Sequence, residues 1–275
     1  MIRNTRNLTL VLFAAFSLIF ASCKKDNTLM YGNLTMGNFL GDKFISDQGN
    51  EFTIVENNSG QTFDGMKRAI MQCDVLNRTA GAENGYDVRV KLINEVLTKA
   101  PVSLEDASND PEKVVDDPIK IDFAWVSGGY LNMYVLFEIQ YNPKKEDSTH
   151  MINLVYNTAE VGTGKYAFTL RHNSYGETLA GKEDSEEESK DENQVQTMNT
   201  DLIQWGLVGA YVSFQLSDII TEEEAELTID WTEHLTDPLN NWLSDVTSKS
   251  SKLLYSKKNF EQAPLTLKSG TKAIR

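Results

Sequence analysis

Arginine, histidine and asparagine follow one another at residues 171–173, in the stretch TLRHNSYGE. Together they form a distinctive group of side chains that can donate and accept hydrogen bonds. A guanidinium group binds carboxylates through paired hydrogen bonds, so Arg171 could hold an acid or a sugar with His172 and Asn173 beside it. The same residues precede a glycine turn, and such side chains often tie a loop to a sheet through backbone hydrogen bonds. We therefore take Arg171, His172 and Asn173 as candidate binding residues, with a structural role as the alternative.

Other sequence features give little support for catalysis. His150 and His172 fall on neighbouring predicted strands, where a nearby carboxylate would complete a metal site, whereas local hydrogen bonds would satisfy both without one. No HExxH, no zinc-spaced cysteine pair, no GxSxG and no glycine-rich phosphate loop before a helix occurs. We expect no enzyme activity, no cofactor and no metal. The alternative is a hydrolase with an unrecognised pair of acids, since acidic residues are abundant.

Aromatic side chains near residue 130 suggest a second kind of binding. Trp125, Tyr130 and Tyr134 could present an aromatic face to a sugar, although such residues more often fill a sandwich core or its rim. We keep Trp125 and Tyr130 as candidate binding residues, and a carbohydrate-binding surface module as an alternative function.

A single thiol ends an apolar run near the N-terminus. Two arginines precede the thirteen uncharged residues LTLVLFAAFSLIF, and the small pair Ala-Ser lies directly before Cys23. Thirteen residues are too few to span a bilayer, which takes about 20, but they suit the apolar core of a secretory signal. The pattern is similar to a bacterial lipobox, whose cysteine receives a diacylglyceryl group. We expect a signal peptide over 1–22, lipidation at Cys23, and a membrane-anchored tether over 23–31.

The charge of the chain restricts its partners. The 275 residues carry a formal net charge of −14, which disfavours binding to nucleic acid because phosphate backbones repel it. We expect a cell-envelope, outer-membrane lipoprotein whose partner is a protein, a peptide or a glycan. The charged residues Lys-Lys-Asp after Cys23 leave both the periplasmic face and the cell surface open.

Alternating apolar residues predict a small β domain over residues 32–100. Short strands are expected around NLTMGNF, EFTIVE and AIMQCDVL, followed by YDVRVKLINEVL with Val88, Val90 and Leu92 on one face. Asn84-Gly85 before the last strand is a strong hairpin signal.

A second set of strands predicts an antiparallel sandwich over residues 101–237. Ile121, Phe123 and Trp125 are expected on one face of a strand, and alternate residues of LNMYVLFEI form the next face. The run KEDSEEESKDENQ, at 182–194, has no apolar residue and predicts a mobile acidic loop. Residues 238–275 are expected to be a loosely held C-terminal tail that begins with a short amphipathic helix.

Several stretches resemble one family, the NigD-like lipoproteins. They are GYDVRVKLINEVLTK, DDPIKI, AWVSGGYLNMYVLFEI, HMINLVYN and LRHNSYGE, and together they run from about residue 30 to residue 231. The resemblance implies an all-β protein, with an N-terminal OB-like β-barrel followed by an antiparallel β-sandwich, in a Bacteroidota-type outer envelope. The family is named after a bacteriocin gene cluster, which implies an immunity or accessory role. No enzyme activity or cofactor is established for it, so Cys23 is the one functional residue that carries over.

Overall fold

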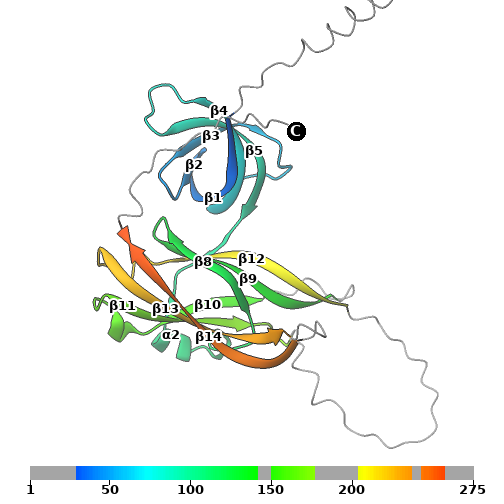
Figure 1. Cartoon of the computed structure of the whole chain (residues 1–275), viewed down its shortest axis with the longest axis vertical. Coiled ribbons are helices and arrows are strands. Elements are labelled where there is room, and N and C mark those ends of the chain that lie inside the picture. Colours follow the sequence, from blue (N-terminus) through cyan, green and yellow to red (C-terminus); the bar gives the residue numbers. More distant parts are fainter. Residues whose placement is uncertain (1–28, 142–149, 177–203, 237–242, 258–275) are drawn as a thin grey trace, which may run out of the picture.

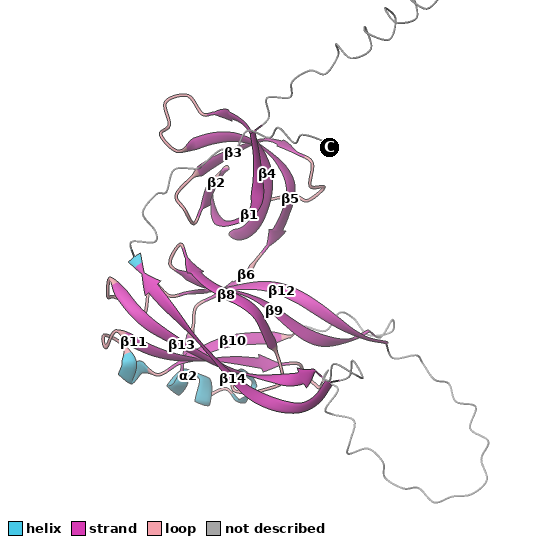
Figure 2. Ribbon diagram, in the orientation of Figure 1, coloured by secondary structure: helices cyan, strands magenta, loops and turns pink. Residues whose placement is uncertain are grey.

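Nearly all of the described chain is β-strand. The computed structural model describes residues 29–141, 150–176, 204–236 and 243–257, and Figure 2 shows strands throughout these ranges. Figure 1 shows a small barrel followed along the chain by a larger two-sheet domain. The expected all-β class, with a barrel before a sandwich, is therefore confirmed. No helix in these ranges is long and apolar enough to cross a membrane.

The first domain is a closed five-stranded barrel. Its strands are β1 (Leu29–Leu40), β2 (Lys43–Ser46), β3 (Glu51–Asn57), β4 (Arg68–Arg78) and β5 (Gly85–Glu95). They close in the order β1-β2-β3-β5-β4, with β3 and β5 parallel, which agrees with the expected OB-like barrel. Buried apolar side chains fill the interior, among them Phe44, Phe52, Met71 and Tyr86.

The prediction that Val88, Val90 and Leu92 share one face of β5 is wrong for Leu92. Val88 and Val90 are buried as expected, but Leu92 is exposed and Ile93 is buried instead. The register between β4 and β5 shifts here, because Val90 pairs with Cys73 whereas Leu92 pairs with the adjacent Gln72. The extra residue in β5 reverses which side chains face inward.

The second domain consists of two facing sheets. The five-stranded sheet has the order β14-β13-β11-β10-β7, and the four-stranded sheet has the order β6-β12-β9-β8. Their strands are β6 (Leu97–Lys99), β7 (Val102–Ser103), β8 (Lys120–Ser127), β9 (Tyr130–Tyr141), β10 (Met151–Tyr156), β11 (Lys165–Asn173), β12 (Gln204–Gln215), β13 (Glu224–Thr236) and β14 (Leu243–Ser256). Three short helices connect them, namely α2 (Leu104–Ser108), η2 (Pro111–Lys113) and η3 (Thr158–Glu160).

The sandwich is confirmed, but its sheets are mixed rather than wholly antiparallel. The pairs β10–β7, β11–β13 and β12–β6 are parallel. The chain passes through the opposite sheet between β11 and β13, so both strands enter their own sheet in the same direction. The remaining pairs of these two sheets are antiparallel.

Strict alternation along β9 creates the main core. Leu131, Met133 and Val135 are fully buried and face the other sheet, where Leu154 and Phe168 are also fully buried. The side chains between them on β9 must therefore point to the outer face of the four-stranded sheet.

The strand bounds differ from the expected domain limits. β1 begins at Leu29, inside the predicted tether 23–31, and β6 pairs with β12 of the sandwich although it falls within the predicted 32–100 domain. The predicted tail 238–275 contains β14, which pairs with β13 along most of its length, so a paired strand replaces the expected helix from Leu243 onward. The signal peptide, Cys23, the acidic loop 182–194 and most of the expected loose end, 258–275, lie outside the described residues.

A buried polar cluster joins the two domains. Arg68 on β4 forms two hydrogen bonds with the Asp47 carboxylate, at 2.8 and 2.7 Å, and both side chains are 1% exposed. The same guanidinium donates to Ser213 on β12 and to Asn132 on β9, at 3.0 and 2.9 Å. Ser127, at the end of β8, donates to Asp47 at 2.6 Å. We call these five residues the domain clamp. The ion pair lies within the barrel, and three hydrogen bonds connect it to the sandwich: Arg68 to Ser213, Arg68 to Asn132, and Ser127 to Asp47. Because a buried charged group that loses a hydrogen-bond partner is costly, these bonds hold the barrel on the sandwich.

The turn after β8 is shaped for this close contact. Gly128 has φ +57°, and a Cβ atom there would lie 2.4 Å from the Asp47 Oδ1 atom. Glycine therefore permits both the turn and the approach of the barrel carboxylate. Beside it, Met36, Ile70 and Val96 form a small buried cluster with Trp125 and Tyr211 packed against it.

Candidate functional site

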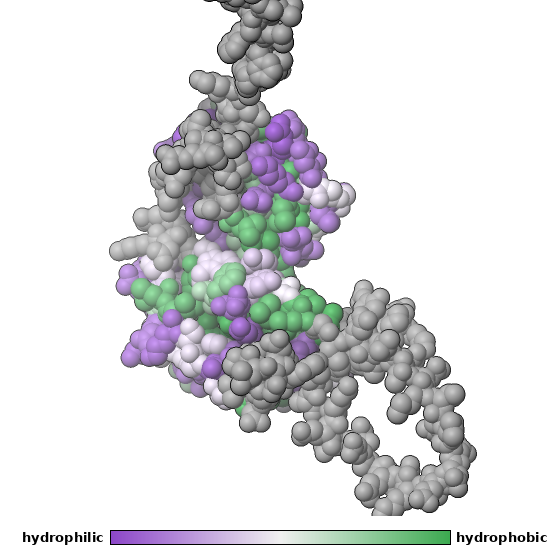
Figure 3. Space-filling view, turned by 45° about the vertical axis from the view of Figure 1, so that its right-hand side comes forward, coloured by the Kyte–Doolittle hydropathy of each residue, from purple (hydrophilic) through white to green (hydrophobic). Residues whose placement is uncertain are grey.

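The barrel covers only one end of the outer face of the four-stranded sheet. Asn132 and Ser213 pair in register on this face and are fully buried beneath the barrel. Farther along the same face, Tyr134 and Leu136 are half-buried, and Leu207 is 64% exposed. In Figure 3 hydrophobic residues gather on the sandwich below the barrel. The uncovered part of this face is the candidate functional site.

A register shift in β8 brings two more aromatic residues to this face. Ile121 pairs with the inward-facing Val135, but Phe123 pairs with the outward-facing Tyr134. The bulge at this point reverses the alternation, so Phe123 and the next alternate residue, Trp125, face outward. The expectation that Ile121, Phe123 and Trp125 share one face is therefore wrong, and the bulge is the reason.

Four rings form a cluster that we call the aromatic platform: Phe123, Trp125, Tyr134 and Tyr211. The Phe123 ring centroid lies 5.6 Å from that of Trp125 and 5.3 Å from that of Tyr134, with interplanar angles of 25° and 23°. Tyr211 lies 4.8 Å from Tyr134 and contacts Phe123 edge-on at 6.3 Å. The three ring neighbours of Phe123 are on its own sheet, and Phe123 is 46% exposed. The platform thus presents a supported ring to solvent.

A glycine on β12 allows the Tyr134 ring to take its position. A Cβ atom on Gly209 would lie 2.0 Å from the Tyr134 hydroxyl oxygen, so any other residue would displace the ring. Burial, and to a smaller extent the nearby Tyr134, raises the pKa of the Tyr211 hydroxyl above its ordinary value. Like any phenol at neutral pH, this hydroxyl is protonated and can donate a hydrogen bond.

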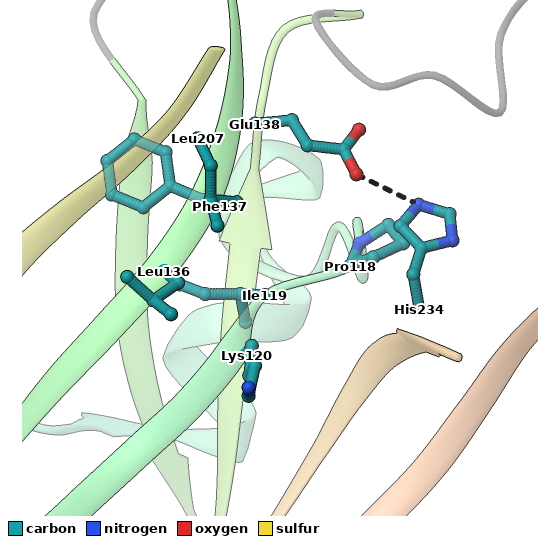
Figure 4. A pocket seen from close by; sticks show the side chains of 8 residues that line it. All are labelled: Pro118, Ile119, Lys120, Leu136, Phe137, Glu138, Leu207 and His234. Carbon is teal, nitrogen blue, oxygen red and sulfur yellow. Dashed lines mark ion pairs between the residues drawn. The ribbon is translucent and has the colours of Figure 1, made fainter. Parts of the chain in front are cut away.

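The same face continues into a small apolar pocket at the end of β9, drawn in Figure 4. Its volume is about 100 Å³, and Leu136, Phe137, Ile119 and Leu207 supply much of its wall. The remaining lining residues are Pro118, Lys120, Glu138 and His234. Glu138 points toward His234 on β13, with 3.8 Å between Oε1 and Nε2.

The pocket contains one carboxylate–imidazole pair, Glu138 and His234, which could hold a proton. Its lining residues include no serine, cysteine or threonine. In the described ranges, no three His, Cys, Asp or Glu side chains are grouped so as to hold a metal ion. The apolar part of the wall could accommodate an apolar group of a ligand.

The predicted residues Arg171 and Asn173 both contact the segment that leads into β8. The Arg171 guanidinium forms an ion pair with Asp116 at 3.0 Å. The Asn173 amide donates to the Glu112 carbonyl oxygen at 3.3 Å, and Ser174 donates two hydrogen bonds to the Asp117 carboxylate. These contacts favour the structural alternative over ligand binding.

His172 is buried between two partners. Its Nδ1 atom lies 3.1 Å from the Pro118 carbonyl oxygen, which can only accept, so Nδ1 carries the proton. Its Nε2 atom lies 2.9 Å from Nδ1 of His150 and accepts from it, while Phe137 contacts both imidazoles. Burial, followed by the adjacent His150, lowers the pKa of His172 from 6.5 to about 4. His172 is therefore neutral at physiological pH and supports two walls of the pocket, Pro118 and Phe137.

The two predicted aromatic residues have different surroundings. Trp125 belongs to the platform and donates its indole N–H to Ser127 at 3.2 Å. Tyr130 lies outside it, because its ring covers the Arg68 guanidinium at 3.9 Å in the domain clamp. Sequence reasoning missed Phe123, Tyr211 and Gly209 as parts of the site. The sequence pattern placed Phe123 on the same face as Ile121, and nothing in it reveals the bulge that turns Phe123 outward.

Comparisons with known proteins agree with this architecture. Residues 101–186 match the family model described as the NigD-like C-terminal beta sandwich domain, so the expected resemblance is confirmed there. No curated protein matches the chain.

Solved structures share the fold at low sequence identity. A toxin-related protein from Parabacteroides distasonis is 21% identical, with 82% of this chain and 92% of that chain covered and a TM-score of 0.52. A NigD-like immunity protein from Bacteroides caccae is 14% identical, with 82% and 96% covered and a TM-score of 0.51. A protein from Bacteroides fragilis, described as a lipoprotein, is 12% identical, with 81% and 96% covered and a TM-score of 0.50.

Proposed function

We propose, from the match of residues 101–186 to the NigD-like C-terminal β-sandwich domain, that the protein is a non-catalytic, lipid-anchored recognition protein of the outer envelope. Its partner binds the outer face of the four-stranded sheet, at the aromatic platform and the adjoining pocket. The role is that of an accessory or protective component, of which bacteriocin immunity is one form.

The anchor is supported by the sequence around Cys23 and by the Bacteroides fragilis neighbour that is described as a lipoprotein. Only five residues separate Cys23 from Leu29, where β1 begins. Even a fully extended chain of that length spans only about 20 Å, so the barrel would stay close to the membrane surface. The sandwich follows the barrel and would carry the platform farther from the lipid.

The exposed platform is the observation that carries the recognition role. Phe123 is 46% exposed and Leu207 is 64% exposed on one face, with half-buried aromatic residues between the barrel and the pocket. Contiguous apolar surface of this kind is costly in water and commonly marks an interaction site. Aromatic residues contribute large contact area with little loss of side-chain entropy, which suits them to binding.

A protective role has one specific point in its favour. The solved neighbour from Bacteroides caccae is described as an immunity protein, and it has the same two-domain fold over most of both chains. An immunity protein acts by binding rather than by turnover, which fits a site with an exposed platform and without a nucleophile in its pocket. A hydrolase would instead have to depend on Glu138 and His234, the acid–base pair of the pocket.

Variants of the lipidated protein in native envelopes test the proposal. We would isolate the protein with its bound partners from cells that carry Phe123→Ser or Glu138→Gln, after mild cross-linking. The matched control is Leu254→Ser on β14, which changes a 62% exposed leucine on a strand of the opposite sheet. The expected result is loss of the same partner with Phe123→Ser and retention with Leu254→Ser.

The result also separates recognition from catalysis. Phe123→Ser should abolish protection or partner retention while the protein stays in the membrane fraction. If Glu138→Gln abolished the biological effect with the partner still bound, the acid–base pair would be reactive and the non-catalytic role would be wrong. If all variants retained the partner equally, the platform would not be the recognition site.

A further inference from the structure

The geometry of the platform also points to the chemical class of its ligand: we infer that it binds a neutral polysaccharide, with one sugar ring stacked on Phe123. This inference deepens the proposed function and rests on it. A pyranose ring has one face of C–H groups, which packs against an aromatic ring, and a rim of hydroxyls, which needs hydrogen-bonding partners. The platform supplies both.

The stacking surface is fixed before a ligand arrives. Trp125 approaches Phe123 from its own strand and Tyr134 from the adjacent strand. Tyr211 abuts the Phe123 ring edge-on. The Trp125 and Tyr134 planes are each inclined by about 25° or less to the Phe123 plane. These neighbours leave Phe123 little rotamer freedom to lose on binding, which is favourable for a ligand that offers only one flat face.

Hydrogen-bonding groups lie beside the stacking surface. Tyr134 and Tyr211 are 4.8 Å apart between ring centroids, and each carries a hydroxyl that can donate and accept. Both hydroxyls are neutral phenols at physiological pH. Sugar hydroxyls are matched by such neutral groups, without the need for a charged side chain.

The charges near the platform and on the whole chain favour a neutral ligand over an anionic one. The nearest charged residues on β8, Lys120 and Asp122, form an ion pair at 3.9 Å and offset each other. The chain as a whole carries −14, so an acidic polysaccharide would be repelled over a longer range.

Backbone pairing limits where a peptide strand could be added near the platform. From Tyr130 to Leu136, β9 is paired with β12 on one side and with β8 on the other, so the edge strand on this side of the sheet is β8, which carries Phe123 and Trp125. A strand added to β8 would lie beside the platform rings rather than over them. A sugar ring needs only the ring face and the hydroxyls that the platform presents.

The experiment uses the lipidated full-length protein in detergent micelles and measures binding by calorimetry. The probes are cellohexaose, maltohexaose, xylohexaose and mannohexaose, with hexagalacturonate as the acidic counterpart. We expect at least one neutral hexasaccharide to bind at a Kd below about 10 mM and hexagalacturonate not to bind. Phe123→Ala should weaken binding by about tenfold or more, as loss of a stacked ring does for nucleobases. Phe123→Tyr should retain binding, and Leu254→Ala should leave it unchanged.

Two results would overturn the inference. One is the absence of binding by all four neutral hexasaccharides at about 10 mM, and the other is binding that Phe123→Ala leaves intact. If the sugars fail while the envelope partner still depends on Phe123, the ligand class is wrong and the proposed recognition role survives. If retention of the envelope partner also does not depend on Phe123, the proposed function itself is wrong.

Discussion

Acidification should destabilise the sandwich domain through one buried imidazole, that of His172. Its Nδ1–H donates to the Pro118 carbonyl oxygen and its Nε2 accepts from His150, so a proton added to Nε2 would break the second hydrogen bond. The same proton would place a positive charge in a buried site next to another imidazole. Both effects oppose protonation in the folded state.

The size of the effect follows from the change in pKa. The pKa of His172 is about 4 in the folded protein and 6.5 for an ordinary histidine, so the unfolded chain binds the proton more readily between these values. The His172 contribution to stability is therefore complete above pH 6.5 and is lost as the pH falls toward 4. A difference of this size corresponds to about 3 kcal/mol of unfolding free energy.

Urea unfolding at a series of pH values from neutral to 4 measures this loss. The comparison is between the native protein and His172→Gln, which cannot titrate but keeps an amide that can donate to the Pro118 carbonyl oxygen. Carboxylates elsewhere titrate in both proteins, so the difference between the two curves isolates His172. We expect the native protein to lose about 3 kcal/mol more than the variant over this range.

Two results would refute the reasoning. Parallel pH curves for the two proteins would mean that His172 does not couple folding to protonation. A directly measured pKa of 6.5 or above, from the ring resonances of His172 in the folded protein, would mean that the charged form is tolerated in the site.

Three further changes test the clamp, the platform and the anchor. Arg68→Met should lower the unfolding free energy by about 3–5 kcal/mol in urea titrations, because Asp47 would remain buried without its guanidinium partner. Gly209→Ala should cost about 1–3 kcal/mol and change the near-ultraviolet circular dichroism, because the new Cβ atom would displace the Tyr134 ring. Cys23→Ser should move the protein from the detergent phase to the aqueous phase of a phase separation, since no acyl chain could be attached.

Each of these changes has a control or an opposing outcome. Lys43→Met removes a partner of the exposed Lys43–Glu51 ion pair and should have almost no effect on stability; if Arg68→Met were equally mild, the clamp would not hold the domains. An unchanged aromatic spectrum for Gly209→Ala would show that Tyr134 does not need the space. Partitioning of Cys23→Ser like that of the native protein would rule out lipidation at this residue.

Local periodicity predicted many strands and much of the sandwich core, although it missed β14. The alternation Leu131, Met133, Val135 appears in the sequence and appears again as buried positions in β9. This feature depends on neighbouring residues, which the sequence shows directly. The barrel before the sandwich was implied by the NigD-like resemblance, because the local pattern predicted only a small β domain there.

The site itself could not be derived in the same way. Single extra residues in β5 and β8 reverse the alternation, and this reversal turns Phe123 outward. The domain clamp joins Arg68 to Ser213, which lie 145 residues apart, and no local pattern indicates that contact. The LRHN stretch does stand out in the sequence, but its chemistry is used to hold the segment that leads into β8.

Site-specific cross-linking in living cells tests the central claim most directly. A photoreactive phenylalanine analogue would replace Phe123 on the platform in one strain and Leu254 on β14 in another, with both proteins anchored in their native envelope. The account predicts a cross-linked adduct of constant composition from position 123 and none from position 254. Adducts from 254 alone, or the same adducts from both positions, would contradict recognition by the platform.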